Sequence, residues 1–521
     1  MDANKGDSWR SHSRLFLACG VVILSPFQYG FDFGMIGGLQ AMDGFLKVFG
    51  YRTPAGTLNI TTERQQLISS LMTLGAFISA ASAGIPATRF GRRACLALAC
   101  VICFVANIIM MTTDNIGALY AGRFIIGLAN GYFMTFSQLY LQESSTAELR
   151  GVFLTAFNFF VSFGTLIGTI VDWATAKRPD KSSYLIPLGL VYVFPFFILC
   201  SILFIPESPR WLILQGRFEE GQKALTWLRP KGHDSLAEAT EIRAAIDREK
   251  ESGSGIGWLD LFKNSVDRRR TFLAVGAVLL QAASGSMFII AYKAYFLRMA
   301  KVSDPFAMSN VLSAISILAF IANSFIVVRF GNRRNLLMTG LAICGILQLI
   351  IATVYQQHPD APATGKVTVG LTAIYMFSYN GMISTYAWLC GGELPTQRLR
   401  SHTFGLAAAA GFAGAWLTTF TAPYFINPAS LNWGPRYGFV WFPSCVVAAA
   451  WVFFFLPEVK NRTLEEIDEM FEARLPARRF RTYVSRGRVE DAVARKSIEA
   501  EKAVSVLKSE KVAAETGVSR D

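Results

Sequence analysis

The sequence predicts an all-α protein that crosses a membrane twelve times. Of its 521 residues, 52% are hydrophobic and only 17% are charged, and the mean hydropathy is +0.36. That balance is typical of a polytopic membrane protein. The apolar runs are continuous and long enough to span a bilayer, which excludes a membrane β-barrel. They cover approximately residues 15–39, 64–86, 94–113, 116–142, 151–175, 184–205, 271–296, 306–328, 336–354, 368–391, 403–425 and 436–456.

Basic residues in the short connections predict the orientation. Three arginines follow the second run (Arg89, Arg92, Arg93) and three follow the eighth (Arg329, Arg333, Arg334). Short basic loops stay in the cytoplasm, and an even number of spans puts both termini there. We therefore expect a cytoplasmic N-terminus at 1–14 and a cytoplasmic tail at 457–521, in a plasma-membrane protein. The run Leu15–Leu39 is too long for a cleavable signal and indicates an anchor.

Repeated motifs predict two six-helix halves in parallel. Arg89-Phe90-Gly91-Arg92-Arg93 recurs at 329–334, Glu143 and Arg150 recur as Glu393 and Arg400, and Pro206-Glu207 recurs as Pro457-Glu458. The offsets are 240 (331 minus 91), 250 (393 minus 143) and 251 (458 minus 207). A near-constant offset in the same order indicates duplication. The predicted units are bundles at 15–205 and 271–456, joined by a cytoplasmic helical linker at 206–270.

Asp32 and Arg123 lie inside apolar runs, where a charge normally marks a transport pathway or a proton site. If the first run leads outward and the fourth inward, both residues lie about five to seven residues from the outer end. At about 1.5 Å per residue their depths match, so they can pair. A carboxylate that can pair or be protonated is a candidate proton switch. The alternative is a structural ion pair that only holds two helices together.

Other classes of site have little support in the sequence. Cys100 and Cys103 have CxxC spacing, but no second pair or nearby histidine accompanies them, so we expect no metal. No nucleophile–base pattern or nucleotide loop indicates an enzyme. The net charge of +13 reflects cytoplasmic loops and tail, and we expect no nucleic-acid partner. Asn59-Ile60-Thr61 is a glycosylation sequon in a predicted outer loop.

Several motifs together resemble the sugar-porter family of the major facilitator superfamily, over roughly residues 15–471. They are GFDFGMIGG (30–38), RFGRR (89–93), GRFIIGLANG (122–131), YLQESSTAELRG (140–151), PESPRWL (206–212), Trp388 to Glu393 and PEVKNRTLEEIDEMF (457–471). The stretches at 285–296 and 432–441 look closest to fungal disaccharide permeases. The resemblance implies a monomeric transporter of the major facilitator fold that works by alternating access, with a proton gradient in place of a cofactor. It also implies that Asp32 and Arg123 form the coupling pair of proton symporters.

The resemblance also implies where a sugar would bind. Gln281 matches a glutamine of the sugar motif, Asn158 stands where the family has a binding glutamine, and Trp388 matches a ring-stacking tryptophan. An amide donates and accepts hydrogen bonds, which suits a hydroxyl-rich ligand. Tyr292 matches a tyrosine that ends the seventh span and is expected to gate or pack. Gln28 and Gln138 are further intramembrane polar candidates. For each, the alternative is a packing or interhelical hydrogen-bond role.

A cytoplasmic gate of charged residues is also implied. The matching positions are Arg92, Arg93, Glu143, Arg150, Arg333, Glu393 and Arg400. Thr88 and Val328 stand where the family carries acids, so we expect a weaker lock. Each arginine could instead serve only to set the topology.

The predicted function is proton-coupled uptake of a sugar, either a disaccharide or glycoside or a hexose, across the lipid bilayer. Ala282, Met287, Gly411 and Ala415 replace polar residues of a hexose site, which leaves more room and fewer hydrogen bonds. A proton-coupled exporter of a less polar metabolite is therefore the main alternative. A non-transporting nutrient receptor on the same fold is the third.

Overall fold

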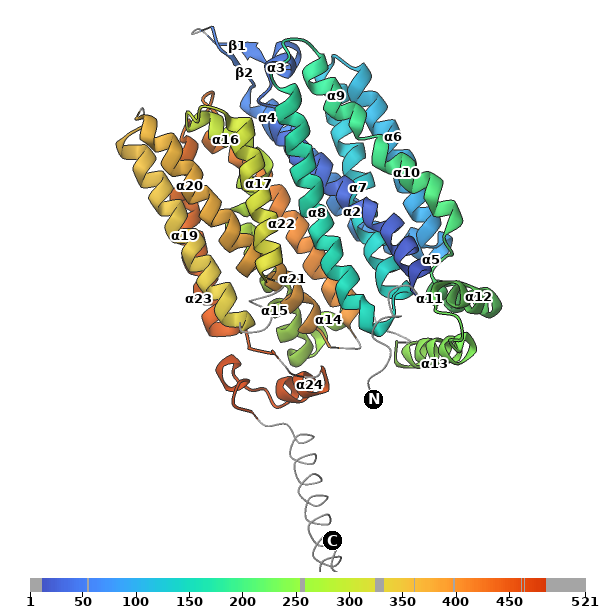
Figure 1. The fold of residues 1–521 in the computed structure, drawn as a ribbon. Helices are drawn as coiled ribbons and strands as arrows, with labels where there is room; N and C mark the ends of the chain where they lie inside the picture. Colours follow the sequence, from blue (N-terminus) through green and yellow to red (C-terminus); the bar gives the residue numbers. More distant parts are fainter. Residues whose placement is uncertain are drawn as a thin grey trace, which may run out of the picture.

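A computed structural model describes residues 12–53, 56–253, 258–323, 332–359, 361–396, 399–460, 462 and 464–483. The described chain is helical apart from one two-stranded ribbon, in which β1 (Tyr51–Arg52) pairs antiparallel with β2 (Leu58–Asn59). The helices form two bundles that stand side by side (Figure 1).

Six helical passes build the first bundle. They are α2 (Ser13–Leu39); α4 (Thr62–Ser82) with α5 (Gly84–Phe90); α6 (Arg92–Thr112); α7 (Ile116–Ser144); α8 (Ala147–Thr175); and α9 (Ser182–Leu190) with α10 (Val193–Ser201) and η1 (Ile202–Phe204). A short helix α3 (Asp43–Phe49) precedes the ribbon.

The second bundle repeats this plan. Its passes are α15 (Ser265–Ala283) with α16 (Ser286–Met299); α17 (Pro305–Ala322); α19 (Arg333–Gln357); α20 (Pro362–Ser378) with the π-helix η3 (Tyr379–Ser384) and α21 (Thr385–Glu393); α22 (Arg400–Ile426); and η4 (Gly434–Tyr437) with α23 (Gly438–Phe455). The predicted major facilitator architecture of twelve spans agrees with these passes.

Hydropathy alone finds fewer spans than the fold contains. Of the described helices, nine are long and apolar enough to cross a membrane, or up to ten with the bent pair α4–α5. The other two passes are α7 and the α20–η3–α21 rod. Both carry polar residues inside their apolar runs, Arg123 and Asn130 on α7 and Asn380 on the rod.

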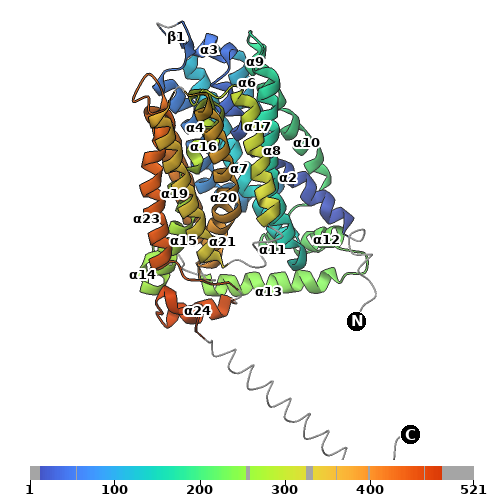
Figure 2. The same cartoon turned by 60° about the vertical axis from the view of Figure 1, so that its left-hand side comes forward.

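The molecule has two distinct ends, which define its long axis (Figure 1). The "hairpin end" carries α3 and the β1–β2 ribbon. The "linker end" carries α11 (Pro209–Leu214), α12 (Phe218–Leu228), α13 (Ser235–Gly253), α14 (Asp260–Lys263), α24 (Leu464–Glu472) and η5 (Ala477–Arg479). Helix α13 runs across the base of the molecule at this end (Figure 2).

The seventh pass is broken, where the sequence suggests one continuous apolar run. Gly285 has φ +81°, a left-handed conformation that ends α15 and redirects the chain into α16. A Cβ at Gly285 would lie 2.7 Å from the Trp441 ring, so space also requires glycine. Tyr292 adds a second distortion, with φ −120° and ψ 21° inside α16.

Glycines allow helix backbones of the first bundle to touch. A Cβ at Gly30 would lie 1.9 Å from the Val161 carbonyl oxygen on α8, and one at Gly164 would lie 2.1 Å from that of Phe27 on α2. Gly127 of α7 packs equally closely on Met72 of α4. Such contacts let helices gain dispersion energy where lipid provides no hydrophobic drive.

We predict that Gly30→Ala destabilises the protein and that Gly20→Ala does not. The added methyl at Gly30 meets backbone that cannot move aside, whereas a Cβ at Gly20 of the same helix meets nothing within 4 Å. Overpacking costs roughly 1–3 kcal/mol, while alanine at an open helical site improves helix propensity. Thermal unfolding of the purified variants measures both. Equal unfolding temperatures for the two variants would contradict the close α2–α8 contact.

Candidate functional site

A fully buried ion pair joins two helices of the first bundle. Nη1 of Arg123 on α7 lies 3.0 Å from Oδ1 of Asp32 on α2, and the two side chains are 1% and 0% exposed. The guanidinium also donates from Nε to the Ile68 carbonyl oxygen at 3.2 Å. The sequence-based expectation that the two charges can pair agrees with this geometry.

Asn130 completes the pair, and sequence reasoning missed it. Its Nδ2 donates to Oδ2 of Asp32 at 2.8 Å, so each carboxylate oxygen has one donor. Arg123 and Asn130 are seven residues apart, which places them on the same face of α7. The seven-residue spacing within GRFIIGLANG was the sequence signal that could have identified Asn130.

The pair is costly to disturb. Removing one partner of a buried ion pair leaves an uncompensated charge, a loss of about 3–5 kcal/mol. Protonating Asp32 has a similar local effect, because it removes the negative charge that Arg123 faces. The contact between α2 and α7 at this depth therefore depends on the charge of the carboxylate.

Gln281 lies at the break in the seventh pass and is engaged within the second bundle. Its Nε2 donates to the carbonyl oxygen of Ser384 at 3.2 Å, and Tyr379 Oη lies 3.5 Å from its Oε1. Both partners belong to η3. A π-helical turn frees carbonyl groups and often marks functional positions. The sequence did not predict Ser384 or Tyr379 as site residues, and no simple sequence pattern predicts a π-helix.

Trp388 and Tyr292 differ in how much of the side chain remains free to contact a ligand. Trp388 of α21 is half-buried and packs against Phe404 with ring centroids 6.0 Å apart, so part of its indole remains open. Tyr292 is fully buried, and its hydroxyl donates to the Thr419 carbonyl oxygen at 2.7 Å. That bond ties α16 to α22 and favours the packing role.

The remaining amide candidates have separate environments. Asn158 is exposed and donates only to the Leu154 carbonyl oxygen of its own helix, at 3.2 Å. Gln138 is half-buried. Gln28 is 0% exposed, and neither its Nε2 nor its Oε1 has a hydrogen-bond partner. An unpaired buried amide costs about 1–3 kcal/mol, which makes Gln28 the strongest of the three as a ligand group.

The predicted gate residues form one cluster in each half. Arg92 pairs with Glu143 at 2.7 Å, and Arg333 pairs with Glu393. Arg93 donates from Nε to the Ile202 carbonyl oxygen at 2.9 Å. Each of these contacts stays within its own half, so none locks one half to the other. Arg400 is half-buried, with an Nε that has no partner; the side chain of Arg150 and residue Val328 lie outside the described part.

The Pro-Glu motifs anchor these clusters in the same way. Glu207 accepts from the backbone N of Arg92 at 3.0 Å, and Glu458 accepts from the backbone N of Arg334 at 3.0 Å. Burial raises the pKa of Glu207, opposed by the backbone N–H groups of Ser208, Arg93 and Arg92. The sequence repeat thus corresponds to a repeated contact that fixes a loop at the linker end.

Hydrogen bonds between the halves gather at the hairpin end. Arg298 donates to the Ala41 carbonyl oxygen at 2.6 Å, and Asn427 donates to Gln65 Oε1 at 2.8 Å. Tyr295 donates to Oδ1 of Asn59 at 3.2 Å, so the sequon residue is half-buried in this contact. Glycosylation at Asn59, which stays a prediction, would have to displace that bond. The described residues therefore show the halves joined at the hairpin end.

A second pair of buried charges escaped the sequence analysis. Asp172 on α8 is 1% exposed and Lys293 on α16 is 4% exposed. Both lie within predicted apolar runs, so the signal that selected Asp32 applied to them as well. Each lies near the end of its run.

We predict a strong energetic coupling between Asp32 and Arg123. Asp32→Asn and Arg123→Gln should each lower the free energy of unfolding by about 3–5 kcal/mol, because each leaves one partner unpaired. The double variant should lose clearly less than the sum. Thermal or denaturant unfolding of the unmodified protein, the two single variants and the double variant gives the coupling energy.

The exposed pair Lys181–Asp114 is the matched control. Its atoms are 2.7 Å apart, but the side chains are 51% and 65% exposed. Its coupling should be about 0–1 kcal/mol. Additive effects at Asp32 and Arg123 would show that the buried pair carries no special energy.

Relatives cover nearly the whole chain. It is 26% identical over 490 residues to the major facilitator-type transporter ecdD of Aspergillus rugulosus, covering 90% of this chain and 89% of that one. It is 26% identical over 468 residues to the low-affinity glucose transporter HXT1 of Saccharomyces cerevisiae, covering 87% and 81%.

Solved structures share the fold. The inward-open conformation of the xylose transporter XylE from E. coli superposes with a TM-score of 0.72 at 20% identity, covering 88% of this chain and 99% of that one. The family described as "Sugar (and other) transporter" matches residues 18–471. This multi-pass membrane protein, which is no enzyme, therefore belongs to the sugar transporter family of the major facilitator superfamily.

Proposed function

We propose that this protein takes up a sugar together with a proton, by alternating access between its two halves. The observation that carries the proposal is the buried Asp32–Arg123 pair with Asn130 as a further donor to the carboxylate. A carboxylate at membrane depth that is held by a single cation can exchange that cation for a proton.

Proton binding would reach the other half through α2. Gly37 lies just over one turn beyond Asp32, and a Cβ there would be 2.5 Å from the Ala291 carbonyl oxygen on α16. A change in the α2–α7 contact would shift this backbone contact between the halves. We infer that protonated Asp32 lets the hairpin end close over substrate, and that Arg123 recovers the carboxylate after proton release at the linker end.

The proposed substrate is a sugar or glycoside. Support comes from the family and from the glucose specificity named for HXT1. Gln281 would hydrogen-bond substrate hydroxyls, and Trp388 would stack on an apolar ring face. Asn158, Gln138 and Gln28 are secondary candidates, and Tyr292 would hold α16 in place. Transport of glucose compared with that of maltose, lactose and cellobiose distinguishes a hexose from a disaccharide.

We propose that the linker end faces the cytoplasm of a cell whose plasma membrane holds the protein as a monomer. Arg92, Arg93, Arg333 and Arg334 all start helices at that end, as the positive-inside rule requires. The described chain also begins and finishes there (Figures 1 and 2).

Export of a less polar metabolite is the second candidate. It is favoured by the apolar lining near Gln281: Ala282 and Met287 replace polar residues, and Gly411 packs on Val278. Such a surface would leave sugar hydroxyls unpaired at about 1–3 kcal/mol each. Proton antiport through the same Asp32 would drive it.

We predict that sugar addition raises external pH in cells that lack their own sugar transporters and express this chain. Glucose, maltose, lactose and cellobiose are tested in turn. Asp32→Asn should abolish the pH rise, because the amide cannot carry the proton, while surface expression stays measurable by immunofluorescence.

Asp114→Asn is the control, since Asp114 is an exposed carboxylate at the hairpin end. Sugar uptake without any pH change would refute coupling and leave facilitated transport. Neither uptake nor a pH change, with protein at the surface, would favour the exporter.

We predict that Trp388→Ala raises the KM of the transported sugar at least tenfold, a loss of about 1.4 kcal/mol. Trp173→Ala removes a tryptophan that is 43% exposed on α8 and should leave KM unchanged. Radiolabelled uptake measures both. An unchanged KM for Trp388→Ala would show that this indole only packs against Phe404.

A further inference from the structure

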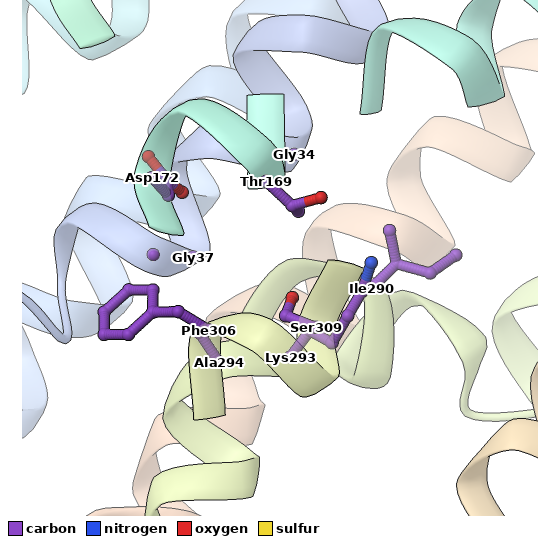
Figure 3. Close-up of a pocket in the computed structure, with 10 residues that line it drawn as sticks. Gly34, Gly37, Thr169, Asp172, Ile290, Lys293, Ala294, Phe306 and Ser309 are labelled. Carbon is purple, nitrogen blue, oxygen red and sulfur yellow. The ribbon is translucent and has the colours of Figure 1, made fainter. Parts of the chain in front are cut away.

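A small polar cavity lies between the two halves near the hairpin end (Figure 3). Helices α2 and α8 of the first half and α16 and α17 of the second enclose it. Gly34, Gly37 and Gly38 form one wall, where the α2 backbone comes so close that a Cβ at Gly38 would lie 2.0 Å from Oδ2 of Asp172. Both halves supply its walls, and they are closed against each other at this end.

Two opposite charges face this cavity from opposite halves. Asp172 and Thr169 come from α8, and Lys293 and Ser309 come from α16 and α17 (Figure 3). Nζ of Lys293 donates to Ser313 Oγ at 2.5 Å. Both carboxylate oxygens of Asp172 are buried without a hydrogen-bond partner. The carboxyl group is therefore enclosed with no donor, while the nearest cation is held elsewhere.

Other charged groups around Asp172 are already engaged. On α2, Asp32 lies six residues before Gly38, about 9 Å along the helix, and is paired with Arg123 of α7. On α16, the Tyr292 and Tyr295 hydroxyls and the Arg298 guanidinium bond to other partners, as described above. On α17, Asp304 accepts from the Ala307 backbone N at the start of the helix. Tyr184 of α9 packs against Phe45 and Phe49.

We propose that Asp172 is a second proton-binding site, occupied when the hairpin end is closed, and that Lys293 sets the pH at which it fills. An ionised carboxylate enclosed without donors is strongly disfavoured. A proton removes that charge. When the hairpin end opens, α16 and α17 leave α8, water reaches Asp172, and the proton dissociates to the outside.

Lys293 opposes this proton from across the cavity, because a nearby positive charge favours the ionised carboxylate. It thereby lowers the pH at which Asp172 takes up its proton. Closure of the hairpin end is thus favoured by low external pH. This site is separate from Asp32 and does not depend on which substrate is carried.

The test measures hairpin-end closure against pH without substrate. Spin labels are placed at Arg178→Cys and Lys366→Cys, two exposed positions on opposite halves, in full-length protein in lipid nanodiscs. Cys200→Ser removes the exposed cysteine, and the seven others are buried. All proteins also carry Asp32→Asn, so the first proton site does not contribute. Double electron–electron resonance gives the closed fraction from pH 5 to pH 8.5.

The background protein carries only the two label sites, Cys200→Ser and Asp32→Asn. Its hairpin end should close as pH falls. Asp172→Asn, a neutral mimic of the protonated acid, should stay closed with no pH dependence. Lys293→Met should keep the pH dependence but move its midpoint up by at least one pH unit. Asp114→Asn, at an exposed carboxylate of the same end, should leave the midpoint unchanged.

Two results would overturn the proposal. One is an Asp172→Asn protein whose closed fraction still follows pH with the background midpoint, which indicates that another group binds the proton. The other is a Lys293→Met protein with an unmoved midpoint, which removes Lys293 from the site. If Asp172→Asn fails to fold, the midpoint of the Lys293→Met protein still tests whether a proton binds beside Lys293.

Discussion

Charges buried at membrane depth are the constraint on which the structure depends. Hydrocarbon cannot solvate an ion or a free backbone group, so a charge at this depth must be paired within the protein or neutralised by a proton. Asp32 finds Arg123 and Asn130, and the three fix how α2 lies against α7. The glycines of α2 then bring its backbone against α8 on one side and α16 on the other. Helix α2 consequently links the buried pair to backbone contacts in both halves.

The duplicated architecture separates contacts within each half from contacts between the halves. At the linker end, each half closes its own loops through an Arg–Glu pair and a Pro-Glu carboxylate that accepts a backbone N–H. These contacts make each half rigid without tying it to the other. At the hairpin end, the contacts cross between halves through Arg298, Tyr295 and Asn427. Alternating access requires this division, because one end must open while each bundle stays intact.

The two glutamines proposed to contact substrate differ in whether their amides already have hydrogen-bond partners. Gln281 is held by the π-helical turn η3, whereas the Gln28 amide has no partner. A ligand that accepts a hydrogen bond from Gln281 Nε2 would have to draw this amide away from the Ser384 carbonyl oxygen. The apolar positions around Gln281 limit how many hydroxyls can be satisfied. If Gln281 and Trp388 contact the substrate as proposed, selectivity would depend on few hydrogen bonds and on stacking against the indole.

The sequence alone determined the membrane class, the spans and the internal repeat. Hydropathy and arginine placement are local properties that need no tertiary contact. Asp32 could be selected because a charge within an apolar run can be recognised from the sequence alone. Asn130, Tyr379 and Ser384 could not be selected in this way, since polar uncharged residues are common in helices. Only the fold decides which helix faces they share. The break at Gly285 and the placement of Asp172 and Lys293 on one cavity likewise arise from packing between distant segments, because both depend on how the helices cross.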